Sequence, residues 1–586
     1  MRLLIVDYLA SLKERAELDA ILPDLLTELG YNVISRPRRG TQQRGVDIAA
    51  VRKVEGEEIL YLFSLKAGNL SRTEWNGPQD QALRPSLDEI RDSYLPNRVP
   101  PKYRDAKVVI CLCFGGEIRE DIRDVVAGYM TNNTTARVSY EEWNGGRIAD
   151  LLLEGLLREQ VLPEAMRSGF RKAVALVDEP DVSYQHFRKV ANQLLSAGRA
   201  NAKARVLSAR QLSLCAWILF VWARSAGNVE AAYRATELAL LYAWELRRGI
   251  AKPTSKDGKA LLNAVGQIAD LHIKAAAELL ERKIIPAALI EDGVSAAVRS
   301  SDAIDLNLAL FDMLGRIGLL AIWLKFMSQR AEGKAKEHFE AHCLAVLKAG
   351  YAMIENNAGL LLPVRDDQTI DIAIFLQAAL VTGADGGPIR NWIEHLIGRL
   401  SYAVRARARY PLTSSDYRDL VEHPRGRSDD EFEEMTKGSI LIPTLALWAR
   451  PLGLTAELAM LSEMVAKDLG HCTMQLWSPD HTSETHLYVN DAAHGYAIAD
   501  LPIDGDGAAL FDIVNSAADR VAEHLDGLSA FAEGFWPVVL VACRHHRLPV
   551  PPGFWVKALA IAPEANEAAD GTATAPPADG SRPVGG

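Results

Sequence analysis

The segments RPRRGTQQRGVDI (residues 36–48) and LYLFSLKAG (residues 60–68) decide the fold of the N-terminal part of this chain. Val46 to Val51 and Ile59 to Leu65 are short apolar runs rich in residues that favour strands. The polar stretch Arg52 to Glu58 separates them. Two such runs around a polar turn predict a β-hairpin.

This hairpin brings together side chains suited to phosphodiester chemistry. Side chains alternate between the faces of a strand, so Ser64 and Lys66 share one face, and Asp47 can share it across the hairpin. A carboxylate binds a hard divalent cation, which polarises a phosphoryl group and lowers the pKa of a bound water. A nearby lysine can orient that water and stabilise the developing charge. The other interpretation is an ordinary hairpin with Asp and Lys on its surface.

A helix is predicted upstream of the hairpin, between Ser11 and Gly30. Glu17 and Asp19 lie at its start. Its apolar residues recur at the spacing of a helix with one buried side, and they are Leu18, Ile21, Leu22, Leu25, Leu26 and Leu29.

The order of these features resembles a known family. The chain resembles the PD-(D/E)XK restriction-endonuclease-like nucleases, especially their Mrr-like branch. The matching features are, in order, an acid-bearing helix, Leu29-Gly30-Tyr31, a strand, Gly45-Val46-Asp47, a second strand and Ser64-Leu65-Lys66. The resemblance covers roughly the first quarter of the chain. It implies an α/β domain with a mixed sheet flanked by helices.

The resemblance also implies a role for each residue that matches the motif. Asp47 would bind the metal, Lys66 would be the catalytic lysine, and Glu17 would be the additional helix acid, with Asp19 as the competing choice. The backbone carbonyl of Leu65 would be a further metal ligand. The implied cofactor is Mg²⁺ or Mn²⁺, and the implied reaction is endonucleolytic cleavage of DNA.

Ser64 departs from the family pattern, which usually has Glu, Asp or Gln at this position. A neutral hydroxyl is a poorer ligand for a hard cation than a carboxylate. We nevertheless expect an active site at this hairpin, because the backbone carbonyl of Leu65 does not depend on the side chain at position 64. The alternative is a catalytically degenerate scaffold that binds nucleic acid or a partner protein without cutting.

Four arginines, Arg36, Arg38, Arg39 and Arg44, precede Asp47 in a chain of net formal charge −11. A nucleic-acid backbone is held mainly by Arg and Lys contacts to phosphates. These arginines are therefore candidate nucleic-acid-binding residues, with a solvated basic loop as the plainer interpretation.

Further strands and helices are expected to complete the sheet domain. Trp75 to Asp80 is predicted to be a polar loop and Gln81 to Tyr94 a short helix. Lys107 to Phe114 is a β-rich run typical of a buried strand. Helix Glu117 to Met130 and strand Ala136 to Tyr140 follow, and the domain closes near residue 160.

The remainder of the chain changes to long Ala- and Leu-rich segments of helical period. Val206 to Ser225, Val229 to Leu246 and Ala303 to Met327 are examples. They predict a large all-α region, similar to a TPR-like helical array. The expected domains are a nuclease domain (1–160), a helical domain (161–410), a second helical lobe with irregular loops (411–560) and a disordered tail (561–586).

The remaining signals concern compartment and partners. No apolar run is long enough to span a bilayer and the N-terminus lacks the basic region, apolar core and cleavage site of a signal peptide, so we expect a cytoplasmic protein. Six scattered cysteines indicate neither a disulfide framework nor a zinc site. The sequence lacks a P-loop motif, so control would come from self-assembly or a separate regulatory or ATPase chain.

The expected function is that of the effector nuclease in a bacterial anti-phage or restriction-like system. The expected substrate is double-stranded DNA, and the sequence leaves the choice between DNA and RNA open. The helical region would sense, assemble or dock a partner.

Overall fold

The structure is a computed structural model that describes residues 5–6, 9–10, 12, 18–35, 44–77, 82–155, 164–298, 302–423 and 428–556. Its contacts divide the chain into two compact units, Met1–Ala275 and Ala276–Gly586. The first unit begins with a mixed sheet and continues with helices, and the second unit is largely helical. A mixed sheet with helices followed by a large helical region is therefore confirmed.

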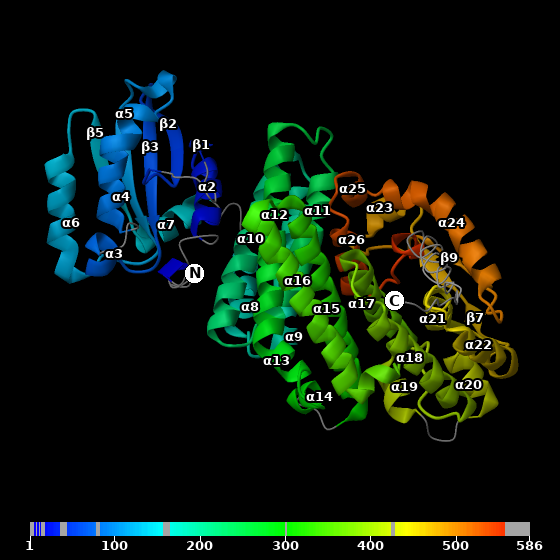
Figure 1. Ribbon diagram of the computed structural model, residues 1–586. Helices are drawn as coiled ribbons and strands as arrows, with labels where there is room; N and C mark the ends of the chain where they lie inside the picture. Colours follow the sequence, from blue (N-terminus) through cyan, green and yellow to red (C-terminus); the bar gives the residue numbers. More distant parts are fainter. Residues whose placement is uncertain are drawn as a thin grey trace, which may run out of the picture. The chain divides into compact units, whose positions relative to one another are not determined.

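Five strands form the N-terminal sheet in the order β1-β2-β3-β4-β5 (Figure 1). The pairs β1–β2 and β2–β3 are antiparallel, whereas β3–β4 and β4–β5 are parallel. The strands are β1 (Asn32–Ser35), β2 (Ile48–Val54), β3 (Glu57–Lys66), β4 (Val108–Phe114) and β5 (Val138–Trp143).

The hairpin between β2 and β3 is longer than its sequence predicts, and its turn is tighter. Val54 pairs with Glu57, which leaves only Glu55 and Gly56 between the strands. These two residues have φ angles of 49° and 94°. Two-residue hairpin turns of type I′ require positive φ at both positions. The polar stretch Arg52 to Glu58 therefore forms mostly strand rather than turn.

Helices cover both faces of the sheet. On one face, α2 (Asp19–Glu28) packs against β1, β2 and α7 (Gly145–Gly155). On the other face, a buried cluster joins the sheet to α3, α4 and α6 and includes Leu62, Trp75 and Leu87. Trp75 is 2% exposed and lies in a helix that ends at Asn76, so the prediction that a polar loop begins at Trp75 was wrong, and residues 78–80 of that loop lie outside the described residues. The elements of this second face are α3 (Arg72–Asn76), α4 (Leu83–Glu89), η2 (Ile90–Tyr94), α5 (Leu95–Asn97), η3 (Pro101–Tyr103) and α6 (Glu120–Asn133).

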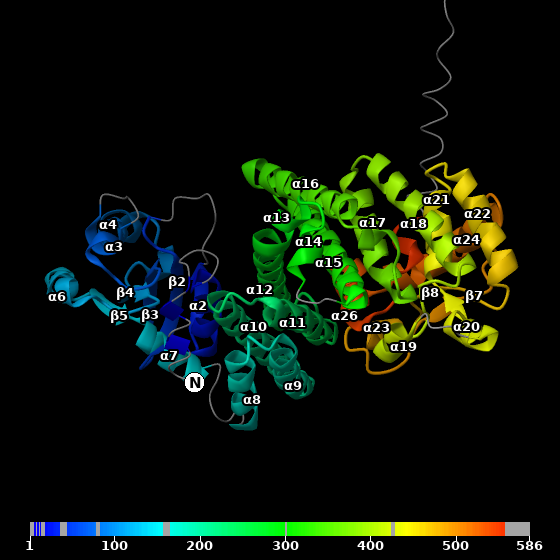
Figure 2. The same ribbon diagram turned by 90° about the horizontal axis from the view of Figure 1, so that it is seen from below.

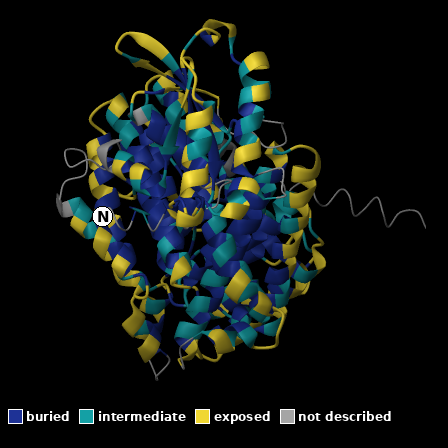
Figure 3. Cartoon of the chain, turned by 90° about the vertical axis from the view of Figure 1, so that its left-hand side faces the viewer, coloured by how far each residue is buried: buried dark blue, intermediate teal, exposed yellow. Residues whose placement is uncertain are grey.

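Four of the helices that follow pack against one another, and residues 208–223 and 231–247 are mostly buried (Figures 2 and 3). The later helices of the first unit are α8 (Glu164–Ala175), α9 (Pro180–Gly198), α10 (Ala202–Ser225), α11 (Glu230–Arg248) and α12 (Lys256–Leu279), whose last turn enters the second unit. The expected domain boundary near residue 160 falls in 156–163 and the expected tail in 557–586, both outside the described residues.

The second unit contains short and long helices with small two-stranded sheets. Its helices are η4 (Leu280–Ile284), α13 (Ile285–Ala288), α14 (Gly293–Ala297), α15 (Ala303–Arg330), α16 (Gly333–Asn356), η5 (Ala358–Leu361), η6 (Asp366–Gln368), α17 (Thr369–Thr382), α18 (Gly387–Arg405), α19 (Tyr417–Glu422), α20 (Asp429–Met435), α21 (Leu441–Ala449), α22 (Thr455–Asp468), α23 (Ser483–His486), α24 (Ala508–Asp526), α25 (Ser529–Ala532), α26 (Pro537–His546) and η7 (Pro552–Phe554). Its strands are β6 (Gly438–Ser439), β7 (Thr473–Met474), β8 (Leu476–Ser478) and β9 (Tyr496–Ile498).

Two helices, α10 and α15, are long and apolar enough to cross a membrane by length and composition. Most residues of the apolar stretch of each helix are buried inside the structure. Core helices of soluble proteins have the same properties, so these two helices are weak evidence for a membrane span.

Candidate functional site

The strand partners of β3 place the candidate residues at one edge of the sheet. β3 runs antiparallel to β2 and parallel to β4, so the start of β2 lies beside the ends of β3 and β4. Asp47 directly precedes β2, and Ser64 and Lys66 belong to the last three residues of β3. The structure therefore brings Asp47, Ser64 and Lys66 to the same edge.

Ser64 and Lys66 also belong to the same face of the sheet. Ala49 lies opposite Leu62 in the hairpin register, and both belong to the buried cluster on the side of α4. The two-residue period extends this face to Ser64 and Lys66 on β3, whereas Asp47 precedes the paired residues of β2 and lies beside the end of β3.

The burial of Ser64 and Lys66 is unusual for an ordinary surface hairpin. Ser64 is 1% exposed and Lys66 is 7% exposed. Lysine is almost never this buried unless it is paired, because removing an ammonium from water costs free energy. The interpretation of Lys66 as a plain surface residue is therefore wrong.

Asp47 leaves the regular ladder of the hairpin. Ile48 is the register partner of Phe63, yet the Asp47 N–H also donates to the Phe63 carbonyl oxygen at 2.9 Å. The Oδ2 atom of Asp47 accepts a hydrogen bond from the backbone N–H of Leu65 at 2.8 Å. The carboxylate thus takes the place of a backbone acceptor and is fixed at the end of β3.

This hydrogen bond also indicates the direction of the Leu65 carbonyl. In an extended strand the N–H and C=O of one residue point to the same side, so the Leu65 carbonyl oxygen points toward the side of Asp47 rather than toward β4. The resemblance to the nuclease family implied these two oxygen atoms as ligands, and both lie on the β2 side of the end of β3.

The helix acids are described in part. Glu17 lies outside the described residues, whereas Asp19 is the first residue of α2. The last turn of α2 leads directly into β1, so the start of α2 lies at the end of the sheet where Asp47 and Lys66 are found. Because α2 packs on the opposite face, an acid at its start would reach these residues only past the ends of the strands.

The arginines of the basic loop are described at one position. Arg36, Arg38 and Arg39 lie outside the described residues. Arg44 forms an ion pair with Glu89 of α4, with Nη1 and Oε1 3.1 Å apart. Both side chains are more than a third exposed, and such surface pairs contribute little stability, so phosphate could compete for Arg44.

The described residues hold few candidate metal ligands. Among them, no group of three or more His, Cys, Asp and Glu side chains is placed to hold a metal ion. The Asp47 carboxylate and the Leu65 carbonyl supply oxygen, which suits Mg²⁺ or Mn²⁺. These two ligands fit a cation that keeps several waters or takes further ligands from substrate.

A polar network beyond the strand ends was missed by the sequence analysis. Asn69 Oδ1 accepts from the Glu117 N–H at 2.9 Å, and Asn144 Nδ2 donates to Glu117 Oε2 and Glu142 Oε1, both at 3.0 Å. The loops after β3, β4 and β5 are thereby joined. Gly116, the second residue after β4, is the available signal, because a side chain there would clash with Oδ1 and the backbone nitrogen of Asn69.

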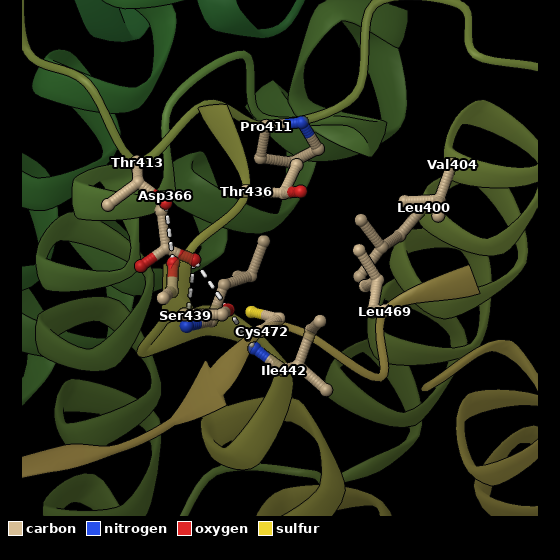
Figure 4. Close-up of a pocket in the computed structure, with 12 residues that line it drawn as sticks. Asp366, Leu400, Val404, Pro411, Thr413, Thr436, Ser439, Ile442, Leu469 and Cys472 are labelled. Atoms are coloured by element: carbon tan, nitrogen blue, oxygen red, sulfur yellow. Dashed lines mark hydrogen bonds between the residues drawn. The ribbon is translucent and has the colours of Figure 1, made fainter. Parts of the chain in front are cut away.

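A separate small cavity lies in the second unit (Figure 4). Asp366 lines it and accepts hydrogen bonds from Ser439 Oγ at 2.6 Å and from the backbone N–H of Ile440 at 2.7 Å. Burial raises the pKa of the Asp366 carboxyl from 3.8 to about 6, and these hydrogen bonds limit the rise. The cavity has a volume of about 20 Å³, enough for about one water. Asp366 therefore caps the start of α21 rather than facing a ligand-sized pocket.

The raised pKa of Asp366 predicts a pH-dependent stability. The folded state binds this proton more tightly than the unfolded chain, so the stabilisation is complete below about pH 4 and is lost as pH rises through about 6. Asp366→Asn should therefore gain stability relative to the wild type between pH 4 and 7, by up to about 3 kcal/mol. Urea unfolding of both proteins across this range measures the difference, and a difference that does not change with pH would contradict the assignment.

Comparison with known proteins adds no relative to this geometry. No family model, curated protein or solved structure matches this chain.

Proposed function

We propose that this protein is a metal-dependent endonuclease that cleaves DNA. The observation that carries the proposal is the hydrogen bond from the Leu65 N–H to Asp47, because it fixes a carboxylate beside the strand end that carries Lys66. The order of the elements supports a PD-(D/E)XK-like domain: a helix is followed by three antiparallel strands, by further helices and then by a parallel strand. Such resemblance of fold is a weaker support than the site itself.

The residues at the strand edge have distinct roles in this proposal. Asp47 and the Leu65 carbonyl would hold Mg²⁺ or Mn²⁺, with Glu17 or Asp19 as a further acid. The bound cation would supply Lewis-acid activation of the phosphate and of water. Lys66 would orient the attacking water and stabilise negative charge that develops on the phosphate. Ser64 would contribute a neutral hydroxyl beside them.

The remaining parts of the chain suit an effector with a separate trigger. The helices after the sheet would form an array similar to TPR proteins and would sense a signal, assemble the protein or dock a partner. We propose a role in bacterial defence against phage or foreign DNA, in the cytoplasm, as a homo-oligomer or with a regulatory or ATPase chain. Arg36, Arg38, Arg39 and Arg44 would contact the DNA backbone.

One observation favours a second candidate function. Ser64 is both neutral and almost completely buried, so it adds no negative charge for a metal. The alternative is a degenerate nuclease fold that binds nucleic acid or a partner protein without cutting it.

Cleavage of plasmid DNA separates these two functions. With Mg²⁺ or Mn²⁺ the wild type should nick or linearise plasmid, and Asp47→Ala and Lys66→Ala should each lower the rate by about 100-fold or more. Lys53→Ala is the matched control, because Lys53 is an exposed lysine of β2. Equal rates for Lys66→Ala and Lys53→Ala would contradict the assignment of Lys66.

Metal affinity tests the position of Ser64. A site with few charged ligands should bind Mn²⁺ weakly without DNA, and Ser64→Glu should tighten that binding because it adds a carboxylate. Isothermal titration with Mn²⁺ compares the wild type, Ser64→Glu and the uncharged control Ser64→Ala, after thermal melting has verified that each variant is folded. If folded Ser64→Glu binds Mn²⁺ no better than Ser64→Ala, position 64 does not face the metal.

A further inference from the structure

A basic surface lies on the helical hairpin of α8 and α9, apart from the strand-edge site. Residues 167–210 include nine Lys and Arg but only three Asp and Glu, although the whole chain has a net charge of −11. Four of these cations are exposed in the hairpin: Arg171 and Lys172 on α8, and Arg188 and Lys189 on α9. We call these four residues the α8–α9 basic face.

The packing of the two helices brings two of these charges, those of Lys172 and Lys189, near one imidazole. The Ser183 hydroxyl donates to the backbone carbonyl of Ala173 at 2.7 Å across the antiparallel hairpin. This contact places Lys172 of α8 near His186 of α9. Burial lowers the pKa of His186 below its ordinary value, and the charges of Lys172 and Lys189 lower it further. The imidazole therefore lies in a region of positive potential.

The cations of this face are not neutralised within the part of the chain that the structure describes. None of the four forms an ion pair there, in contrast to Arg199 near the end of α9, which pairs with Glu245 at 2.8 Å. The acids of the same sequence segment are Asp178, Glu179 and Asp181, and they lie at the turn of the hairpin. The face is therefore available for an anionic partner.

The shape and composition of the face favour nucleic acid over an acidic protein. Protein interfaces bury apolar and aromatic side chains at their centre. The only exposed large hydrophobic residue described on α8 and α9 is Val182, near the turn of the hairpin. Exposed Gln185 and Gln193 flank the cations, and amide side chains also donate to phosphate oxygens. A helix of 19 residues such as α9 is about 28 Å long, the length of roughly eight base pairs of B-DNA.

We propose that the α8–α9 basic face binds the phosphate backbone of duplex DNA, as a DNA contact additional to the strand-edge site and its basic loop. The inference deepens the proposed nuclease function, because the helical region would hold the same DNA that the strand edge cuts. Binding by this face does not itself require cleavage, so the two can be tested separately.

The experiment measures DNA binding by the full chain with cleavage disabled. A fluorescent duplex of about 30 base pairs is titrated in EDTA with protein that carries Lys66→Ala. The test variant adds K172Q/K189Q. The matched control adds K252Q/K256Q, which changes two exposed lysines of the same unit and lowers the net charge equally. Affinity is measured at several salt concentrations.

The test variant should bind about tenfold or more weakly, and the slope of log affinity against log salt should fall by roughly 2, because each lost phosphate contact removes about 0.9. The control should bind like the parent. No DNA binding by the parent, or equal affinity and slope for the test and control variants, would overturn the proposal. Tighter binding to polyglutamate than to DNA, lost in the test variant, would also overturn it and assign the face to an acidic protein.

Cleavage by the protein with Lys66 intact is scored separately. DNA binding that depends on Lys172 and Lys189 without any cleavage would contradict the proposed nuclease function and would support the basic face.

Discussion

The direction of β3 is the constraint on which the candidate site depends. β3 is antiparallel to one neighbour and parallel to the other, so the start of β2 and the ends of β3 and β4 meet at one edge. At this edge Asp47 lies outside the regular strand pairing, and its side chain accepts a hydrogen bond from the Leu65 N–H. A one-residue shift of β3 would turn Ser64 and Lys66 to the opposite face and would separate them from Asp47. The hairpin register therefore decides whether this chain has a nuclease-like site.

The helical region is connected to the sheet domain by more than the chain. The first compact unit includes both the sheet and the helices through most of α12. Asp24 of α2 and Arg210 of α10 are both buried, and their Oδ1 and Nη2 atoms are 3.9 Å apart. Breaking a buried charge pair is costly because one charge is left uncompensated. Since α2 begins with Asp19, this pair links the helices to the element that carries a candidate metal acid.

The sequence predicts those features that depend on local patterns. The apolar runs 46–51 and 59–65 predict the hairpin and the shared face of Ser64 and Lys66, and helical period predicts α10 and α15 closely. The tight turn at Glu55 and Gly56 was missed because polar residues at an exposed hairpin tip look like a loop. Trp75 was assigned to a loop because its polar neighbours conceal a short helix whose one large apolar side chain is buried.

Features that join distant segments could not be read from such patterns. The hydrogen bonds among Asn69, Glu117 and Asn144 connect residues that are far apart in the sequence. The burial of Lys66 likewise depends on tertiary packing, which a local pattern does not reveal. The roles of Glu17 as a metal ligand and of Arg36, Arg38 and Arg39 as DNA contacts stay predictions. These residues lie outside those that the structure describes.

The central claim is that the strand edge at Asp47, Leu65 and Lys66 holds a divalent cation. Anomalous diffraction from crystals soaked in Mn²⁺ tests it most directly. The expected result is an anomalous peak about 2 Å from both an Asp47 carboxylate oxygen and the Leu65 carbonyl oxygen, lost in Asp47→Ala crystals. Manganese bound elsewhere in the chain, with no peak at this edge, would contradict the claim.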